Sequence, residues 1–322
     1  MDTSLARVSH VKTSPSENFA GHLLAGLGKT PKEIACKYFY DDTGSRLFDA
    51  ICELPEYYQT RTEMMLLRRH AGEIAALMGP EAEIVEFGAG SLRKVRLLLD
   101  ALDNPFAYTP LDISGDYLQD VVRSLAADYP ALILRPLVED FTGPLDIPAL
   151  PGRPDIRRAG FFPGSTIGNF KPDGAMALLR RMRASLNGGG LLIGVDLVKD
   201  PARLHAAYND AAGVTALFNK NLLARANREL DAGFDLEGFA HYAPYNPALH
   251  RIEMYLVSLK RQRVSLCGRQ IEFAQGEAVH TEDSHKYTIE SFREMACRAG
   301  FNPRAVWTDE ERLFSVHWLE SR

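Results

Sequence analysis

The chain has 322 residues, 46% of them hydrophobic and 25% charged, which is the composition of a folded protein with one enlarged domain or two interleaved ones. Its net charge of -5 lacks the basic surplus that marks nucleic-acid-binding proteins. The segment from Met1 to Gly21 has no apolar signal core, and no run approaches the roughly 18 apolar residues that cross a bilayer. The cysteines have neither disulfide nor zinc spacing: Cys36, Cys52, Cys267 and Cys297. We therefore expect a cytoplasmic monomer whose partner is a small molecule, with no nucleic acid and no membrane.

From Thr62 onward the apolar spacing predicts a helix that ends at Gly79-Pro80, and strands and helices then alternate. The expected strands are 83–87, 107–111, 132–137, 160–163 and 190–197, and the expected helices are 93–102, 115–127 and 173–186. Such alternation predicts an α/β fold with a doubly wound, mostly parallel sheet that carries helices on both faces.

The segment 199–230 interrupts this alternation, because it predicts two long helices rich in asparagine. Strand-like pieces follow at 251–259 and 263–267, and the chain closes with a helix at 289–299 and a hairpin of 304–308 and 313–319. We expect one domain from 62–198 and 288–322, with a second, substrate-binding domain from 1–61 and 199–287.

A glycine-rich turn, Gly88-Ala89-Gly90-Ser91, follows the first strand of the alternating region. We expect Gly88 and Gly90 to take the positions where a Cβ most obstructs a ligand, and the turn to direct N–H groups at that ligand. The dinucleotide fingerprint needs a third glycine where Arg93 stands, so a nicotinamide cofactor is disfavoured.

Acidic residues accompany three successive strand ends. Asp112 can accept hydrogen bonds from both ribose hydroxyls of a nucleoside, or it can be the N-cap of the helix that begins near Ser114. Asp140 can accept from the exocyclic amine of an adenine, and Phe141 can pack on its ring face. Glu86, just before Gly88, matches the acidic residue that lies near the methionine end of S-adenosylmethionine in the class I fold. This set favours the class I S-adenosylmethionine fold over a nicotinamide fold.

Long motifs extend from about residue 30 to about residue 290. They are YFYD (38–41), GSRLFD (44–49), LPEYY (54–58), TRTE (60–63), GSTIGN (164–169), DLVKD (196–200), YNDAAGVT (208–215), RIEM (251–254) and TEDSHKY (281–287). These motifs resemble those of the bacterial L-histidine Nα-methyltransferases of ergothioneine biosynthesis, a family that also contains fungal enzymes acting on a prenylated tryptophan. Asp283 and His285 depart from the family pattern, and we expect them to alter the charge of the pocket.

The resemblance implies S-adenosylmethionine-dependent trimethylation of the α-amino group of L-histidine to hercynine, the first step of ergothioneine biosynthesis. It implies that the cofactor-binding residues are Tyr57, Gly88, Lys94, Asp112, Asp140 and Phe141. It implies that the substrate-binding residues are Tyr57, Asn169, Tyr208, Met254, Glu282 and Ser284. Tyr40 is implied as the catalytic residue beside the α-amine.

These assignments fit the chemistry of an amino acid. Asn169 and Tyr208 are donors suited to the carboxylate, whereas Glu282 accepts from an imidazole N–H and Ser284 serves the other nitrogen. Structural alternatives stay open: a loop cap for Asn169, a core position for Tyr208 and a solvated turn for Glu282. Another free amino acid, such as tryptophan or a derivative, and a non-catalytic S-adenosylmethionine-binding protein are the rival functions. His280 is close in sequence, but we expect no metal site because a set of three or four ligands is lacking.

Overall fold

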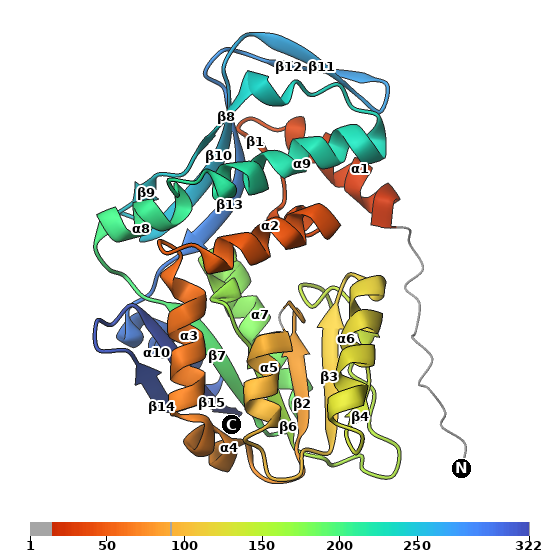
Figure 1. Ribbon diagram of the computed structural model, residues 1–322, viewed down its shortest axis with the longest axis vertical. Helices are drawn as coiled ribbons and strands as arrows, with labels where there is room; N and C mark the ends of the chain where they lie inside the picture. Colours follow the sequence, from red (N-terminus) through yellow and green to blue (C-terminus); the bar gives the residue numbers. More distant parts are fainter. Residues whose placement is uncertain (1–14, 91, 322) are drawn as a thin grey trace. The chain divides into compact units, whose positions relative to one another are not determined.

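The computed structural model describes residues 15–90 and 92–321 and divides them into two compact units (Figure 1). The first unit comprises Thr62–Leu197 and 287–321, and the second comprises 15–61 and Val198–Lys286. Most of the second unit, Val198–Lys286, is therefore an insertion in the sequence of the first unit. The rest of the second unit, 15–61, precedes the first unit in the sequence. Which ligand each unit binds stays a prediction.

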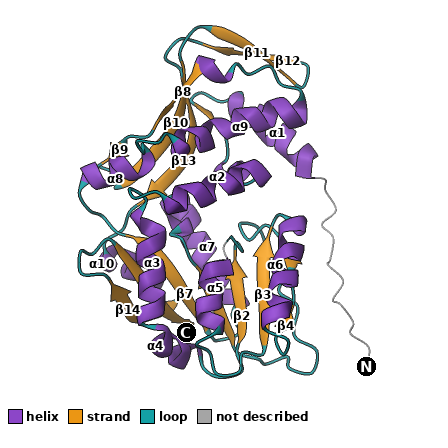
Figure 2. Ribbon diagram, viewed as in Figure 1, coloured by secondary structure: helices purple, strands orange, loops and turns teal. Residues whose placement is uncertain are grey.

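The first unit is built on an eight-stranded sheet (Figure 2). Its strands are β2 (Glu83–Phe87), β3 (Ala107–Asp112), β4 (Ile133–Leu134), β5 (Leu137–Val138), β6 (Arg158–Phe162), β7 (Gly190–Asp196), β14 (Phe301–Thr308) and β15 (Phe314–Ser321). The order is β14-β15-β7-β6-β2-β3-β4, with β5 also paired to β3. The neighbouring strands β7, β6, β2, β3 and β4 run parallel to one another. Strand β15 pairs antiparallel with β7 and forms a hairpin with β14.

Helices cover both faces of this sheet. One core includes side chains of α3 (Tyr58–Arg69), α4 (Ala71–Met78), α5 (Leu92–Leu99) and α6 (Gly115–Asp128), and the other includes those of α7 (Pro172–Ser185) and α10 (Ile289–Arg298). Successive strand residues point to opposite faces, so Ile84 of β2 joins the first core and Val85 joins the second. The expected doubly wound α/β architecture with a mostly parallel sheet is confirmed.

Two predicted elements are wrong in detail. The single helix expected from Thr62 breaks at His70, whose backbone leaves the helical region, so α3 and α4 are separate. The strand expected at 132–137 splits into β4 and β5, because Pro136 between them has no N–H to donate to a ladder.

The second unit contains a five-stranded sheet of order β1-β13-β10-β8, with β9 also paired to β10. Its strands are β1 (Lys32–Glu33), β8 (Phe239–Tyr242), β9 (Tyr245–Asn246), β10 (Arg251–Ser258) and β13 (Ala278–His285), and a separate hairpin joins β11 (Gln262–Leu266) to β12 (Arg269–Phe273). Its helices are α1 (Pro15–Leu27), the 3₁₀ helix η1 (Cys36–Phe39), α2 (Asp42–Glu53), α8 (Pro201–Tyr208), α9 (Val214–Leu230) and the short η3 (Leu236–Gly238).

The asparagines of the inserted helices tie them to the rest of the second unit. The side-chain amide of Asn219 donates to the Tyr255 carbonyl at 2.9 Å, and that of Asn221 donates to Asp41 at 2.7 Å. The amide of Asn227 donates to the Phe234 carbonyl at 2.8 Å. Polar amides out of contact with water need such partners, so Asn219 and Asn221 fix α9 against segments far away in the sequence, and Asn227 fixes the end of α9 to the loop that follows it. No helix in the described part of the chain is long and apolar enough to cross a membrane.

Candidate active site

The turn between β2 and α5 requires glycine at one of its two glycine positions. Gly88 has a φ of +79°, and a Cβ there would lie 3.2 Å from Cε1 of Phe141. At Gly90 the φ is not in the left-handed region and a Cβ would meet no described protein atom within 4 Å, so its expected closeness to a ligand stays a prediction. Only Gly88 therefore combines the left-handed conformation with close approach to another residue.

The N–H groups of the turn differ from the expectation. Those of Gly88 and Ala89 donate to the Leu111 carbonyl at 2.9 and 3.0 Å, and that of Gly90 donates to the Gly88 carbonyl at 2.9 Å. These three N–H groups therefore already donate to carbonyls of the protein. Ser91 lies outside the described residues.

Asp112 ends β3 and is not the helix cap. Ser114 is the N-cap of α6, since its hydroxyl accepts from the Tyr117 N–H, while Asp112 Oδ1 accepts from the Ser114 N–H at 2.9 Å. Burial raises the pKa of Asp112 to about 6, and the two backbone N–H bonds of Ser114 and Ile113 oppose that rise. A half-buried carboxylate at this strand end suits the hydroxyls of a ribose.

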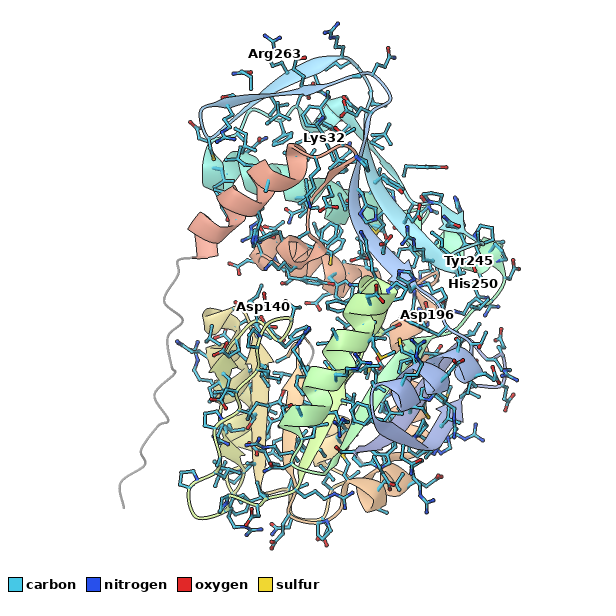
Figure 3. All side chains as sticks on the ribbon, turned by 180° about the vertical axis from the view of Figure 1, so that it is seen from behind. Lys32, Asp140, Asp196, Tyr245, His250 and Arg263 are labelled. Atoms are coloured by element: carbon cyan, nitrogen blue, oxygen red, sulfur yellow. The ribbon has the colours of Figure 1, made fainter. Side chains whose placement is uncertain are left out.

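Asp140 and Phe141 follow β5, and Asp140 lies at the loop end of the first unit in Figure 3. Its Oδ1 accepts from the Thr142 N–H at 2.9 Å and from the Thr142 hydroxyl at 2.5 Å. The Phe141 ring meets Phe162 edge-on at 5.7 Å between centroids and borders Gly88. The strand ends of β3 and β5 thus both contact the glycine turn, through the Leu111 carbonyl and the Phe141 ring.

Glu86 supplies an unsatisfied acceptor next to this turn. Its Oε2 accepts from the Tyr108 hydroxyl, whereas its Oε1 is buried with no hydrogen-bond partner among the described residues. Burial raises the pKa of Glu86 to about 8, although Tyr108 and Lys94 act in the opposite direction. A buried orphan acceptor beside a glycine cradle fits S-adenosylmethionine, which carries an ammonium group and ribose hydroxyls as donors.

Lys94 is held by a carboxylate that the sequence analysis did not single out. Its ammonium lies 2.6 Å from Glu63 Oε2, and both atoms are almost fully buried. Glu63 also accepts from the Gly164 N–H at 2.9 and 3.0 Å, and a Cβ on Gly194 would lie 2.0 Å from Glu63 Oε1. Glu63 thus joins α3, α5 and the loop after β6; the TRTE motif contained it, but only its partners reveal this role.

Asn169 also belongs to the first unit. It ends the short 3₁₀ helix η2 (Thr166–Asn169), which follows Ser165 in the left-handed region at a φ of +57°. The Ser165 hydroxyl accepts from the Asp196 N–H at 2.9 Å, which fixes this loop to the end of β7. Tyr208, the other expected carboxylate donor, belongs to the second unit.

Tyr40 and Tyr57 belong to a row of aromatic rings in the second unit. Ring centroids are 5.6 Å apart for Tyr40 and Phe48, 6.1 Å for Phe48 and Tyr57, and 6.5 Å for Tyr57 and Tyr208. Desolvation raises the pKa of both Tyr40 and Tyr57 well above 10, and Glu282 among other neighbours adds to the rise. Both tyrosines are therefore neutral O–H groups near pH 7.

Met254 and Glu282 lie opposite each other on the antiparallel strands β10 and β13. The pairing shifts by one residue just beyond them, where Thr281 is the additional residue of a β-bulge. Glu282 and Ser284 are two residues apart on β13 and so share a face. Burial raises the pKa of Glu282 to about 7, with Lys286 lowering it and Asp283 raising it.

Ser284 joins a buried polar group that we call the Tyr208 cluster: Tyr208, Ser284 and Lys286. The hydroxyls of Tyr208 and Ser284 are 2.7 Å apart, and the Lys286 ammonium donates to both. The second unit therefore brings all six of its expected site residues together: Tyr40, Tyr57, Tyr208, Met254, Glu282 and Ser284. Lys286 is the member that the sequence analysis missed, although the TEDSHKY motif contained it.

Asp283 faces away from Glu282 and has partners of its own. Its carboxylate lies 3.2 Å from Arg251 Nη1 and 3.0 Å from His280 Nε2. Burial acts to raise the pKa of Asp283, but His280 and Arg251 hold it below its ordinary value. Asp283 is therefore an anion that acts on Glu282 through space. Within residues 15–90 and 92–321, no group of three or more His, Cys, Asp or Glu residues could hold a metal ion.

Comparison with known proteins agrees with this geometry. Residues 19–321 match the family described as histidine-specific methyltransferase, S-adenosylmethionine-dependent. The Histidine N-alpha-methyltransferase of Mycolicibacterium smegmatis is 41% identical, over 94% of this chain and 95% of that protein. Ergothioneine biosynthesis protein 1 of Neurospora crassa is 31% identical over 86% of this chain, which matches 32% of that longer protein.

A solved structure shares the fold alone. It is described as a possible exported protein from Bordetella parapertussis, with a TM-score of 0.50 at 13% identity, covering 88% of this chain and 85% of that one. The family match extends over nearly the whole length of the chain, including both units. The chain therefore belongs to the family of histidine-specific, S-adenosylmethionine-dependent methyltransferases.

Proposed function

We propose that the enzyme methylates the α-amino group of L-histidine three times and so produces hercynine, the first step of ergothioneine biosynthesis. The observation that carries this proposal is the pairing of a buried acid with a hydroxyl cluster. Glu282 lies opposite Met254, and Ser284, on the same strand face, is hydrogen-bonded to Tyr208. A side chain with two ring nitrogens satisfies such groups, and a wholly apolar side chain leaves them unmatched.

S-adenosylmethionine, when bound, would supply an electrophilic methyl group, which a neutral amine attacks in line as the thioether sulfur leaves. In the first unit we assign Gly88, Asp112, Asp140 and Phe141 to its nucleoside and Glu86 to its methionine end. Gly88 permits close approach of the backbone, and Asp112 accepts from the ribose. We assign Lys94 to the same ligand.

In the second unit we assign Tyr208, together with Asn169 of the first unit, to the substrate carboxylate. Glu282 accepts from one imidazole nitrogen and Ser284 serves the other. Tyr40 and Tyr57 lie beside the amine and the methyl group that it receives.

Tyr40 orients the amine and does not remove its proton. Desolvation raises the pKa of Tyr40 well above 10, so a tyrosinate is scarce near neutral pH. The neutral tyrosine hydroxyl can direct the amine or a water molecule, and a dedicated strong base is not required. As methyl groups accumulate, the faces of Tyr40, Phe48 and Tyr57 stabilise the growing cation.

A panel of free amino acids with excess S-adenosylmethionine, followed by mass spectrometry, tests the proposal. We expect trimethylated histidine to accumulate, with tryptophan converted at least ~100-fold more slowly because the polar groups of the pocket stay unmatched. Glu282→Ala should lose histidine turnover and keep cofactor binding. Glu272→Ala is the matched control, since Glu272 is an exposed partner of Arg263 in the same unit. Accumulation of a monomethyl product alone, or faster conversion of tryptophan, contradicts the proposal.

Cofactor binding without turnover of any amino acid is the result that the rival non-catalytic function predicts, and calorimetry detects it directly. We further predict that the enzyme acts as a monomer in the cytoplasm. None of the four cysteines, all of which lie within the described residues, forms a disulfide, which suits a reducing compartment. Light scattering at micromolar concentration tests the monomer.

A further inference from the structure

Lys286 is a buried cation beside two proposed substrate-binding residues. The residue is only 3% exposed, and its ammonium lies 2.7 Å from Ser284 Oγ and 3.0 Å from the Tyr208 hydroxyl. The same ammonium lies 4.8 Å from the centre of the Tyr208 ring. A buried lysine is uncommon unless it is paired, so its contacts with these two side chains need a reason.

The donors and acceptors of the Tyr208 cluster constrain one another. An ammonium has three donors and no acceptor, so both hydroxyl oxygens accept from Lys286. The hydroxyls are also 2.7 Å from each other, so the proton of one bridges the two oxygens. The proton of the other hydroxyl is then directed away from Lys286. The ammonium thereby fixes which way the donors of Tyr208 and Ser284 point.

Lys286 also acts on Glu282 electrostatically. It is the cation of the second unit that lowers the pKa of Glu282, against desolvation and the charge of Asp283. Glu282 in turn raises the pKa values of three neighbouring groups, Cys36, Tyr40 and Tyr57. Desolvation raises the pKa of the Cys36 thiol to about 12 and those of the two tyrosines further above 10, so all three are neutral at pH 7.

We propose that Lys286 is a positioning residue of the histidine site, which orients the hydroxyls of Tyr208 and Ser284 for the substrate beside Glu282. This inference rests on the proposed function, because it takes these three residues as the substrate's partners. Lys286 couples recognition of the substrate's carboxylate to recognition of its ring, since one ammonium holds the group assigned to each.

Three variants of Lys286 separate its hydrogen bonds from its charge. Lys286→Met removes both, Lys286→Gln keeps an N–H donor without the charge, and Lys286→Arg keeps the charge. We expect Lys286→Met to raise KM for histidine by about ten- to a hundredfold, the range for a lost hydrogen bond to a charged group. KM for S-adenosylmethionine should change less than about twofold, and Lys286→Arg should recover most of the loss. Lys260→Met is the matched control, because Lys260 pairs with Asp235 on the surface of the same unit at 2.6 Å.

The pH dependence of histidine binding is the measurement that a purely structural role does not change. We expect the apparent pKa of binding to move to higher pH in Lys286→Met and Lys286→Gln, and to stay in place in Lys286→Arg. Should Lys286→Met fail to fold, the comparison of Lys286→Gln with Lys286→Arg carries the same test. A KM for histidine or a pH profile in Lys286→Gln equal to that of the wild type overturns the inference.

Glu282→Ala in the same assay separates the two proposals. If it leaves histidine binding unchanged, the assignment of the histidine site is wrong and the role of Lys286 is rejected with it. If Glu282→Ala loses histidine while the neutral Lys286 variants behave as wild type, only the positioning role is rejected.

Discussion

Two buried glutamates have pKa values raised by desolvation, and their surroundings suit them to different ligands. One carboxylate oxygen of Glu86 accepts from the Tyr108 hydroxyl, and burial raises the pKa of Glu86 to about 8. Burial raises the pKa of Glu282 only to about 7, because the positive charge of Lys286, in the same unit, lowers it. A carboxyl group near its pKa at neutral pH changes charge readily when a ligand arrives. Both groups therefore make binding depend on pH.

Glu282 predicts a pH dependence of histidine affinity. Because the raised pKa is about 7, the carboxylate that accepts from imidazole is lost as pH falls through 7. We expect the affinity of the wild type to rise from pH 6 to pH 8. In Glu282→Gln the affinity should be weaker and nearly flat above pH 7, because free imidazole is already neutral there, with a pKa of about 6.5.

Calorimetric titration of both proteins with histidine, at saturating cofactor, measures this difference. Binding of S-adenosylmethionine alone is the control and should not distinguish the two proteins. Parallel pH profiles for wild type and Glu282→Gln between pH 7 and pH 8 are the result that would count against Glu282 as the titrating group.

At the scale of the elements, the turn after β2 and the bulge in β13 place the two sets of side chains. The turn has one glycine whose φ is +79° and one glycine that tolerates a Cβ. The bulge at Thr281 interrupts the regular register of β10 and β13 beside Glu282. Thr281 itself donates to Asn219 at 2.8 Å, so the bulge is fastened to α9. Each device breaks the regular element at the point where a ligand group is needed.

The two glycines of the turn predict opposite outcomes for the same substitution. Gly88→Ala places a residue in the left-handed region, at a cost of about 1–3 kcal/mol, and forces Phe141 to move. We expect it to weaken S-adenosylmethionine binding by about tenfold or more. Gly90→Ala is the matched control and should bind within about twofold of the wild type. Isothermal titration measures both, and equal loss in the two variants contradicts the assignment of the cradle to Gly88.

At the scale of the whole molecule, the chain carries two compact units, and each has its own set of proposed ligand groups. Asn169 is the one substrate residue assigned from the first unit, and Tyr57 is the one cofactor residue assigned from the second.

Ligand-dependent melting separates the two sets of groups. A ligand that binds only the folded state stabilises it by about 2.7 kcal/mol at 100 times its Kd. We expect S-adenosylmethionine to raise the Tm of the wild type and of Glu282→Ala equally, and histidine to raise only that of the wild type. Asp112→Ala should lose the shift with S-adenosylmethionine. Loss of both shifts in Glu282→Ala would show that it perturbs the whole fold.

Much of the first unit could be predicted because its signals are local. Strand β2 has the predicted bounds, since a segment of five residues that leads directly into a glycine turn is too short for a helix. The break at His70 and the split around Pro136 were missed, because apolar spacing persists through both. In the second unit, β1 and β9 have two residues each and exist only through their pairing with β13 and β10. A strand of two residues is too short to show the alternation of apolar and polar residues that predicts a strand.

The sequence by itself determined the fold class and the family and suggested most of the proposed site residues, since alternating elements and long motifs consist of consecutive residues. The tertiary structure alone decided which of those residues have partners. Three contacts join residues far apart in the chain: the ion pair of Glu63 with Lys94, the hydrogen bond from Lys286 to Tyr208, and the hydrogen bonds from the glycine turn to the Leu111 carbonyl. Burial and charge act through space, so pKa shifts and hydrogen-bond directions follow only once the chain has folded.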